Sequence, residues 1–162
     1  MARAQITDFL HNFRYNVVEG DPNLLDRSTK FLSIAAGFTS VSIPEVSTDI
    51  AEYRDGLSPL TKKFPTWPTF SDVTIERGVV RGDSEFFNWM DAAAGTSGYR
   101  ADVQIQHIHR TGWFLNSPAR IYRLLEAFPI TMKVSSDLAG DSGDVAIASM
   151  TLALEGLELI EG

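Results

Sequence analysis

The amino-acid sequence predicts a mainly β protein, an antiparallel β-barrel or sandwich of about seven strands with one flanking α-helix. Two observations lead to this fold class. Short segments of alternating apolar and polar residues recur along the chain, separated by turns rich in Gly, Pro and Asp. Only residues 84–94 show the spacing of a convincing amphipathic helix. A length of 162 residues suits one domain, so we expect a single domain over residues 1–162.

The composition limits the classes of function. The chain is 44% hydrophobic and 22% charged, with a formal net charge of −7, which argues against tight binding to nucleic acid. It has no cysteine, so disulfides, thiolate chemistry and cysteine-based metal sites are excluded. Asp8 interrupts the start before an apolar run can form, and no apolar stretch reaches about 18 residues. We therefore expect no signal peptide, no membrane anchor and a cytosolic chain.

Strands are predicted from the beginning of the chain. Residues 1–10 are expected to be flexible or bound to a partner, and alternation over residues 13–18 predicts the first strand. The apolar run at residues 31–37 predicts a second, more buried strand. Residues 46–54 predict a further strand with two unlike faces. One face carries Val46, Thr48, Ile50 and Glu52, and the other carries Ser47, Asp49, Ala51 and Tyr53. The second face is small and polar, which a buried core would not select.

The segment 55–69 is predicted to be a long, stiff loop. Its three prolines fix φ and remove backbone donors, which makes the connection non-helical. Loops of this length in compact domains are usually functional or disordered. Three aromatic side chains argue against disorder, because they need a surface to bury against in this chain or in another. They are Phe64, Trp67 and Phe70.

A strand and the helix follow this loop. Residues 71–80 place Val73, Ile75 and Arg77 on one face of a strand, and Asp83 or Ser84 can cap the helix. The helix then presents one apolar stripe, which we assign to the core rather than to a partner. Its members are Phe86, Trp89, Met90 and Ala93. Further strands are predicted at residues 99–109, 119–125, 128–134 and 145–155, with a hairpin loop at 137–144.

No segment carries a recognisable catalytic constellation. His107 and His109 would point to the same side of a strand, but a zinc site needs three or four ligands, so we interpret them as structural or surface histidines. The tripeptide 81–83, Arg-Gly-Asp, is better explained by a turn and a helix cap than by adhesion. No serine lies in a nucleophile elbow, and no glycine-rich loop precedes the helix to hold a phosphate. We predict no catalytic residue, no cofactor and no metal.

Acidic side chains in the predicted loops are read in the same way. They are Asp55, Asp83, Asp137, Asp141 and Asp144. Loops and turns are where aspartate is ordinarily found, and no spacing marks a pair for acid–base work.

Residues 70–79, Phe-Ser-Asp-Val-Thr-Ile-Glu-Arg-Gly-Val, followed by Phe-Phe-Asn-Trp at 86–89, resemble the tail tube proteins of contractile-tailed phages and contractile injection systems. That family shows a strand of the form aromatic-x-Asp-Val-Thr-Leu-x-Arg-Gly before a helix with a Trp. Three other regions resemble its first strand, its strand into the long loop and its final hairpin. They are residues 13–17, residues 46–56, and residues 126–131 with 145–148 and 154–157. Residues 63–68 and 104–118 depart from the family pattern.

The resemblance implies a tail-tube or Hcp-like barrel subunit whose copies form rings of six. The rings would stack into a hollow tube that conducts DNA or a protein payload through a target envelope. The implied partners are further copies of the chain, the tail sheath protein, baseplate or tube-initiator proteins and the tape measure protein. The payload would pass through the lumen without specific binding, and the surface near the helix would face the sheath. The implied location is the virion tail or an injection particle, assembled in the bacterial cytoplasm.

Two hypotheses about sites result. The predicted assembly contacts are Asp55, Lys62, Lys63, Phe64, Trp67 and Phe70, chosen from the length and aromatic content of the loop. The predicted lumen-facing residues are Ser47, Asp49 and Ala51. The alternatives are an Hcp-like ring protein of type VI secretion and a small enzyme or ligand-binding barrel.

Overall fold

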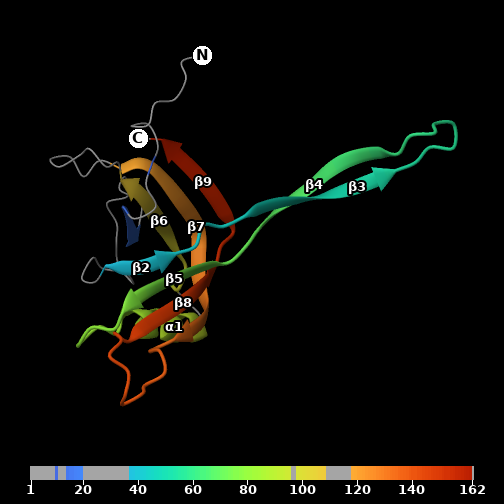
Figure 1. The fold of residues 1–162 in the computed structure, drawn as a ribbon. Helices are drawn as coiled ribbons and strands as arrows, with labels where there is room; N and C mark the ends of the chain where they lie inside the picture. The colour runs from blue at the N-terminus through green and yellow to red at the C-terminus, as the bar shows by residue number, and fades with distance from the viewer. Residues whose placement is uncertain (1–9, 11–13, 20–36, 96–97, 109–117, 162) are drawn as a thin grey trace.

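The computed structural model describes residues 10, 14–19, 37–95, 98–108 and 118–161, which form nine strands and one helix (Figure 1). The elements are β1 (Tyr15–Glu19), β2 (Phe38–Val41), β3 (Val46–Tyr53), β4 (Lys62–Phe70), β5 (Val73–Gly78), α1 (Glu85–Ala94), β6 (Ala101–Ile108), β7 (Pro118–Lys133), β8 (Ile147–Ala153) and β9 (Gly156–Glu161). Of the predicted elements, the strand at 31–37 falls almost wholly outside the described residues, as does the lead at 1–10.

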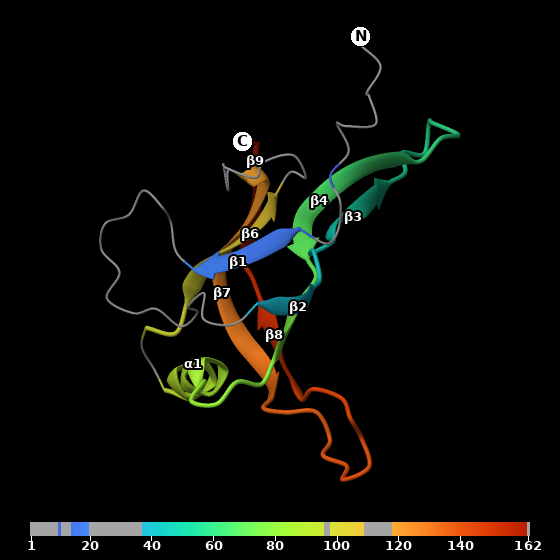
Figure 2. The same cartoon turned by 60° about the vertical axis from the view of Figure 1, so that its left-hand side comes forward.

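Seven strands form one curved antiparallel sheet, which confirms the predicted fold class. Its order is β1-β6-β7-β8-β5-β2, with β9 also paired to β7. The two strands at the ends of this path approach each other (Figure 2), and the Tyr15 hydroxyl on β1 donates a hydrogen bond of 3.0 Å to the Phe38 carbonyl on β2. The sheet therefore curls into a partly closed barrel around its core.

Strand β7 belongs to both halves of this sheet. Its first half pairs with β6 and β9, and its second half pairs with β8. The strand bends at Glu126, which has a φ of 52°, and the Glu126 N–H donates to Asp102 Oδ1 at 3.1 Å. The prediction of two separate strands at 119–125 and 128–134 is therefore wrong, because a bulge lets one 16-residue strand turn the corner. The predicted strand at 145–155 is likewise shorter, and β9 after it was not predicted.

The core lies between the curled sheet and α1. Along β5, Val73 and Ile75 are fully buried, and Arg77 joins them on the same face, as predicted. Helix α1 lies against β7 and contributes Phe86 and Trp89 to the core. The Trp89 Nε1–H donates to the Tyr99 carbonyl at 2.6 Å, so the buried indole is satisfied. Of the predicted apolar stripe, Phe86 and Trp89 are thus core residues, whereas Met90 and Ala93 are only half-buried.

Strands β3 and β4 form a separate two-stranded sheet that projects from the body (Figure 1). We call residues 46–70 the arm. The prediction of a stiff loop over 55–69 is wrong, because β4 begins at Lys62 and only residues 54–61 connect the strands. Pro65 and Pro68 lie opposite Ile50 and Thr48, and both strands are edge strands, where proline is tolerated.

The base of the arm is fixed to the chain by a pair of hydrogen bonds. The Ser71 N–H donates to the Glu45 carbonyl at 3.0 Å, and the Glu45 N–H donates to Ser71 Oγ at 2.8 Å. Two residues, Ser71 and Asp72, then lead from β4 directly into β5. The arm is therefore continuous with a central strand of the sheet.

Candidate assembly surface

The arm exposes apolar side chains on both of its faces. Every residue of β3 is exposed, as is every residue of β4 before Phe70. Leu57 in the tip is 97% exposed, and Trp67 on β4 is 86% exposed. An isolated two-stranded hairpin is only marginally stable in water, and clustered exposed apolar groups mark interaction sites. The arm thus has the properties of a segment that is completed by another molecule.

The register of the arm defines its two faces. Ser47 Oγ lies 2.8 Å from Thr69 Oγ1, which places both hydroxyls on one face. The opposite face carries an exposed ion pair between Lys63 Nζ and Glu52 Oε1 at 3.6 Å. Between these two pairs the register shifts, and Thr66 Oγ1 donates to the Asp49 carbonyl at 2.8 Å. The register shift is a bulge, which increases the local twist of the arm.

The predicted assembly residues all lie on the arm, but on a strand rather than in a loop. Asp55 lies in the tip, where its Oδ1 accepts the Leu57 N–H at 2.7 Å and shapes the turn. The other five belong to β4, and Phe70 at its base is only half-exposed, opposite Val46. They are Lys62, Lys63, Phe64, Trp67 and Phe70.

The predicted lumen-facing residues lie on the partner strand β3. Ser47, Asp49 and Ala51 are exposed, and Ala51 lies directly opposite Phe64. The two predicted sets therefore share a hairpin, and Ala51 and Phe64 share a face of it. Sequence reasoning missed the exposed tip residues Leu57 and Leu60, because the pattern alone does not show that the tip is uncovered.

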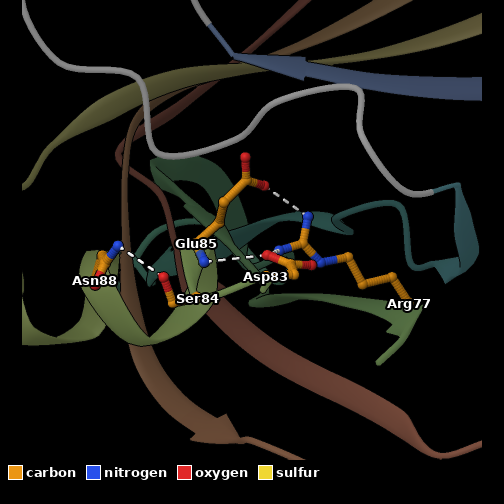
Figure 3. A network of polar contacts seen from close by, with 5 residues as sticks. All are labelled: Arg77, Asp83, Ser84, Glu85 and Asn88. Atoms are coloured by element: carbon orange, nitrogen blue, oxygen red, sulfur yellow. Dashed lines mark hydrogen bonds and ion pairs between the residues drawn. The ribbon is translucent and has the colours of Figure 1, made fainter. Parts of the chain in front are cut away.

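The turn before α1 is organised by a buried arginine (Figure 3). The Arg77 side chain is 2% exposed and forms ion pairs with Asp83 Oδ1 at 2.6 Å and Glu85 Oε2 at 2.7 Å. Its guanidinium carbon lies 4.2 Å from the centroid of the Phe86 ring. A buried charge is costly unless it is paired and hydrogen-bonded, and these contacts supply the pairing. The network fixes the first turn of the helix to β5.

The same network explains the Arg-Gly-Asp tripeptide. Gly82 has a φ of 83°, which favours glycine, and the Asp83 carboxylate accepts the Glu85 N–H at 3.1 Å. Asp83 thus caps the helix start, as one of the two predicted candidates. Ser84 occupies the N-cap position, and its Oγ accepts a hydrogen bond of 3.2 Å from Asn88 Nδ2. The turn-and-cap interpretation of the tripeptide is confirmed.

An open cavity of about 330 Å³ lies at the mouth of the curled sheet, and its lining includes Tyr15, His107 and Tyr122. Burial raises the pKa of the Tyr15 hydroxyl above its usual value. His109, the second histidine of the predicted pair, falls outside the described residues. Among the residues that the structure describes, no three metal-ligating side chains of His, Asp or Glu gather at one place. No helix in the described segments is long and apolar enough to cross a membrane.

The fold and the arm together define a class: a small antiparallel β protein with an uncovered hairpin suited to association. The sequence pattern of the family described as T4-like virus tail tube protein gp19 matches residues 11–158. The chain therefore belongs to the T4 gp19 tail tube family, as the resemblance predicted, and is a tube subunit of a tail or an injection particle. A comparison with curated protein sequences found no match.

Solved structures share this fold over almost the whole chain. A chain from the sheath-tube complex of an extracellular contractile injection system, PVC, in its extended state is 23% identical, with a TM-score of 0.77 over 97% of this chain and 95% of that chain. A chain from the tube-terminating cap of the anti-feeding prophage is 20% identical, with a TM-score of 0.78 over 99% of this chain and 97% of that chain. At these identities the likeness concerns the fold.

Proposed function

We propose that copies of this chain associate into rings of six and that the rings stack into a hollow tube inside a contractile sheath. The tube would carry DNA or a protein payload through a target envelope. The observation that carries this proposal is the arm, whose apolar side chains have no cover among the described residues of the subunit. In a tube, neighbouring subunits would cover these side chains.

The energetics favour covering the arm. Burying a large apolar side chain such as Trp67 or Leu60 stabilises an interface by roughly 1.5–3 kcal/mol. Several such side chains on one hairpin can offset the association cost of about 4–15 kcal/mol when many subunits assemble. The assembly residues proposed for these contacts are Asp55, Lys62, Lys63, Phe64, Trp67 and Phe70.

The lumen is proposed to be lined by Ser47, Asp49 and Ala51. Their side chains are small, and two of the three are polar, which suits a wall that a payload must slide past. The net charge of −7 supports passage of DNA without specific binding, since like charges repel.

The remaining partners are proposed from the family and from the assemblies in which similar folds occur. The solved structures are named as a sheath-tube complex, a baseplate and a tube-terminating cap. We propose that this chain, as one domain over residues 1–162, contacts a sheath protein near α1, a baseplate or initiator protein, and a tape measure protein. We propose assembly in the bacterial cytoplasm and a mechanical role without catalysis, cofactor or metal.

Removal of the arm tests the proposal. The purified chain should form rings or stacked tubes in negative-stain images, with a mass in light scattering that is a multiple of six subunits. A variant in which residues 50–66 are replaced by a short Gly-Ser turn should keep a folded sheet, seen as a cooperative unfolding transition in circular dichroism, and should lose stacked tubes. Normal tubes from this variant would contradict the proposal.

The same images separate the alternatives. An Hcp-like ring protein of type VI secretion would give rings, and a sheath gene or a secretion gene cluster beside this gene would identify the machine. A ligand-binding barrel would give a monomer. The cavity near Tyr15 and His107 is the feature that favours this last alternative, and a stable monomer at high concentration would support it.

A further inference from the structure

Helix α1 and the loop between β7 and β8 lie at the end of the molecule opposite the arm (Figures 1 and 2). This end carries a second exposed apolar surface. We call it the loop-end surface. It consists of Val79, Val80, Phe87, Val134 and Val145, which are between 44% and 71% exposed. These side chains come from the turn before α1, from α1 itself and from both sides of the loop between β7 and β8.

Contacts join these residues into one surface. A small cavity of about 80 Å³ is lined by Val79, Val80, Phe87 and Val134, among others. The Val79 N–H donates to the Ala146 carbonyl at 2.8 Å, which brings the β7–β8 loop against the turn. A Cβ on Gly78 would lie 3.8 Å from Val145 Cγ1, so Val145 borders the same place.

The loop between β7 and β8 adds an acidic groove to this surface. An open cavity of about 540 Å³ is lined by residues from Ser136 to Ile147, including Asp137, Asp144 and Leu138. Lys133 Nζ pairs with Asp137 Oδ1 at 3.2 Å, and Ser142 Oγ donates to Asp144 Oδ2 at 3.2 Å. Arg81 is an exposed cation of the neighbouring turn. Asp144 thus adjoins the exposed Val145, and Asp141 is a further exposed acid of the same loop.

The tip of the arm carries the complementary chemistry. Leu57 and Leu60 are 97% and 74% exposed, respectively. The cations Arg54, Lys62 and Lys63 flank them and are all exposed, and Lys63 also pairs with Glu52. The nearby anion, Asp55, is engaged with the backbone of the turn. An apolar tip with basic flanks matches an apolar surface with an acidic border.

The two features lie at opposite ends of the molecule, so they meet only between copies. We propose that the arm tip of one copy docks on the loop-end surface of a second copy. The contact joins two different surfaces, so repetition continues it from copy to copy. This inference rests on the proposed function and names the surface that receives the arm.

Disulfide cross-linking tests the contact directly, because the native chain has no cysteine. Differently tagged copies carrying Leu60→Cys and Val145→Cys are mixed, assembled and oxidised. We expect a disulfide between the two tags. The matched control pairs Leu60→Cys with Leu159→Cys, which lies on the exposed strand β9 away from the loop end, and should give no cross-link.

Charge reversal then tests the proposed complementarity. Asp141→Lys with Asp144→Lys should slow cross-linking by about five-fold, as expected for losing exposed ion pairs. Arg54→Glu with Lys62→Glu in the other copy should restore it. Asp72→Lys, which changes an exposed acid outside the surface, should leave the rate unchanged.

The outcomes separate this inference from the proposed function. Tubes that form without the Leu60–Val145 cross-link would overturn the docking surface and leave the tube function standing. Equal cross-linking at Leu159, or cross-linking that ignores both charge reversals, would also overturn it. A chain that forms neither rings nor tubes would count against both.

Discussion

The curled sheet and the arm are built from the same kind of antiparallel ladder, yet they differ in how their side chains are covered. Along β5, buried residues alternate with half-buried ones, and Val73 and Ile75 are fully buried. Along β3, every residue is exposed, including Ile50 and Tyr53 at 60%. The sheet has the helix and its own curvature as a second layer, whereas the arm has none among the described residues. An alternating pattern predicts a strand, but it does not show which molecule supplies the cover.

The largest effect on stability is expected from truncating a side chain at the centre of the hydrophobic core. Trp89→Ala should lower the free energy of unfolding by about 3–5 kcal/mol, because the fully buried indole leaves a cavity and its hydrogen bond is lost. Urea denaturation followed by circular dichroism measures this. A loss below about 1 kcal/mol would mean that α1 is not a true layer of the core.

A somewhat smaller effect is expected from the buried arginine. Arg77→Met should cost about 2–4 kcal/mol, because Asp83 and Glu85 keep their charge without this partner in a partly buried site. Urea denaturation of this variant should show the loss. Adding Asp83→Asn and Glu85→Gln should recover some of it, since the uncompensated charges are then removed. No recovery would show that Arg77 acts through its packing on Phe86 instead.

A still smaller effect concerns pH and the edge of the sheet. Burial raises the pKa of Tyr15 above the ordinary value of 10.0, so the unfolded chain releases this proton before the folded chain does. The contribution of the protonated Tyr15 hydroxyl to the free energy of unfolding is therefore fully present below about pH 10. It is lost as the pH rises further. Between about pH 9 and 11, Tyr15→Phe should lose stability less steeply than the native chain in urea titrations. Tyr53→Phe on the arm is the control, and an equal effect of both variants would contradict the prediction.

The smallest effect on stability is expected on the arm itself. Trp67→Ala should change the free energy of unfolding by no more than about 0.5 kcal/mol, because the side chain is 86% exposed. The same variant should raise the concentration at which rings or tubes appear in light scattering. This contrast with Trp89→Ala is the sharpest test of the difference between sheet and arm. A large stability loss at Trp67 would show that the arm is covered within the subunit.

Much of the sheet could be predicted from the sequence. A strand that is buried on one face has apolar residues at every second position, and this alternation is visible in the sequence. Strand β5 was found for this reason, with Val73, Ile75 and Arg77 placed on one face. Helix α1 was found from the i, i+3, i+4, i+7 spacing of its apolar residues. Strand β4 was missed because its prolines indicate a loop, and only the pairing with β3 shows that edge positions accept them. The bend of β7 was missed because the bulge at Glu126 is a single irregular position, which no repeating sequence pattern marks.

The candidate site was predicted only partially. Phe64 and Trp67 predicted a contact with another surface, because large aromatic side chains are usually buried rather than exposed in a connection. Their place on a projecting hairpin depends on tertiary pairing between β3 and β4, which the sequence does not display. The loop-end surface was not predicted, because Val79, Phe87 and Val145 come from three separate elements and meet only in the fold.

The direct passage from β4 into β5 also has a mechanical consequence. Only Ser71 and Asp72 separate the two strands, and the Glu45–Ser71 hydrogen bonds hold the junction. A pull along the arm is therefore delivered to β5, whose ladder with β8 extends from Val73 to Gly78. Load applied along such a ladder is shared by all of its hydrogen bonds at once, whereas peeling would break them one by one. The arm is thus anchored in a strand that is hydrogen-bonded on both sides, to β8 and to β2.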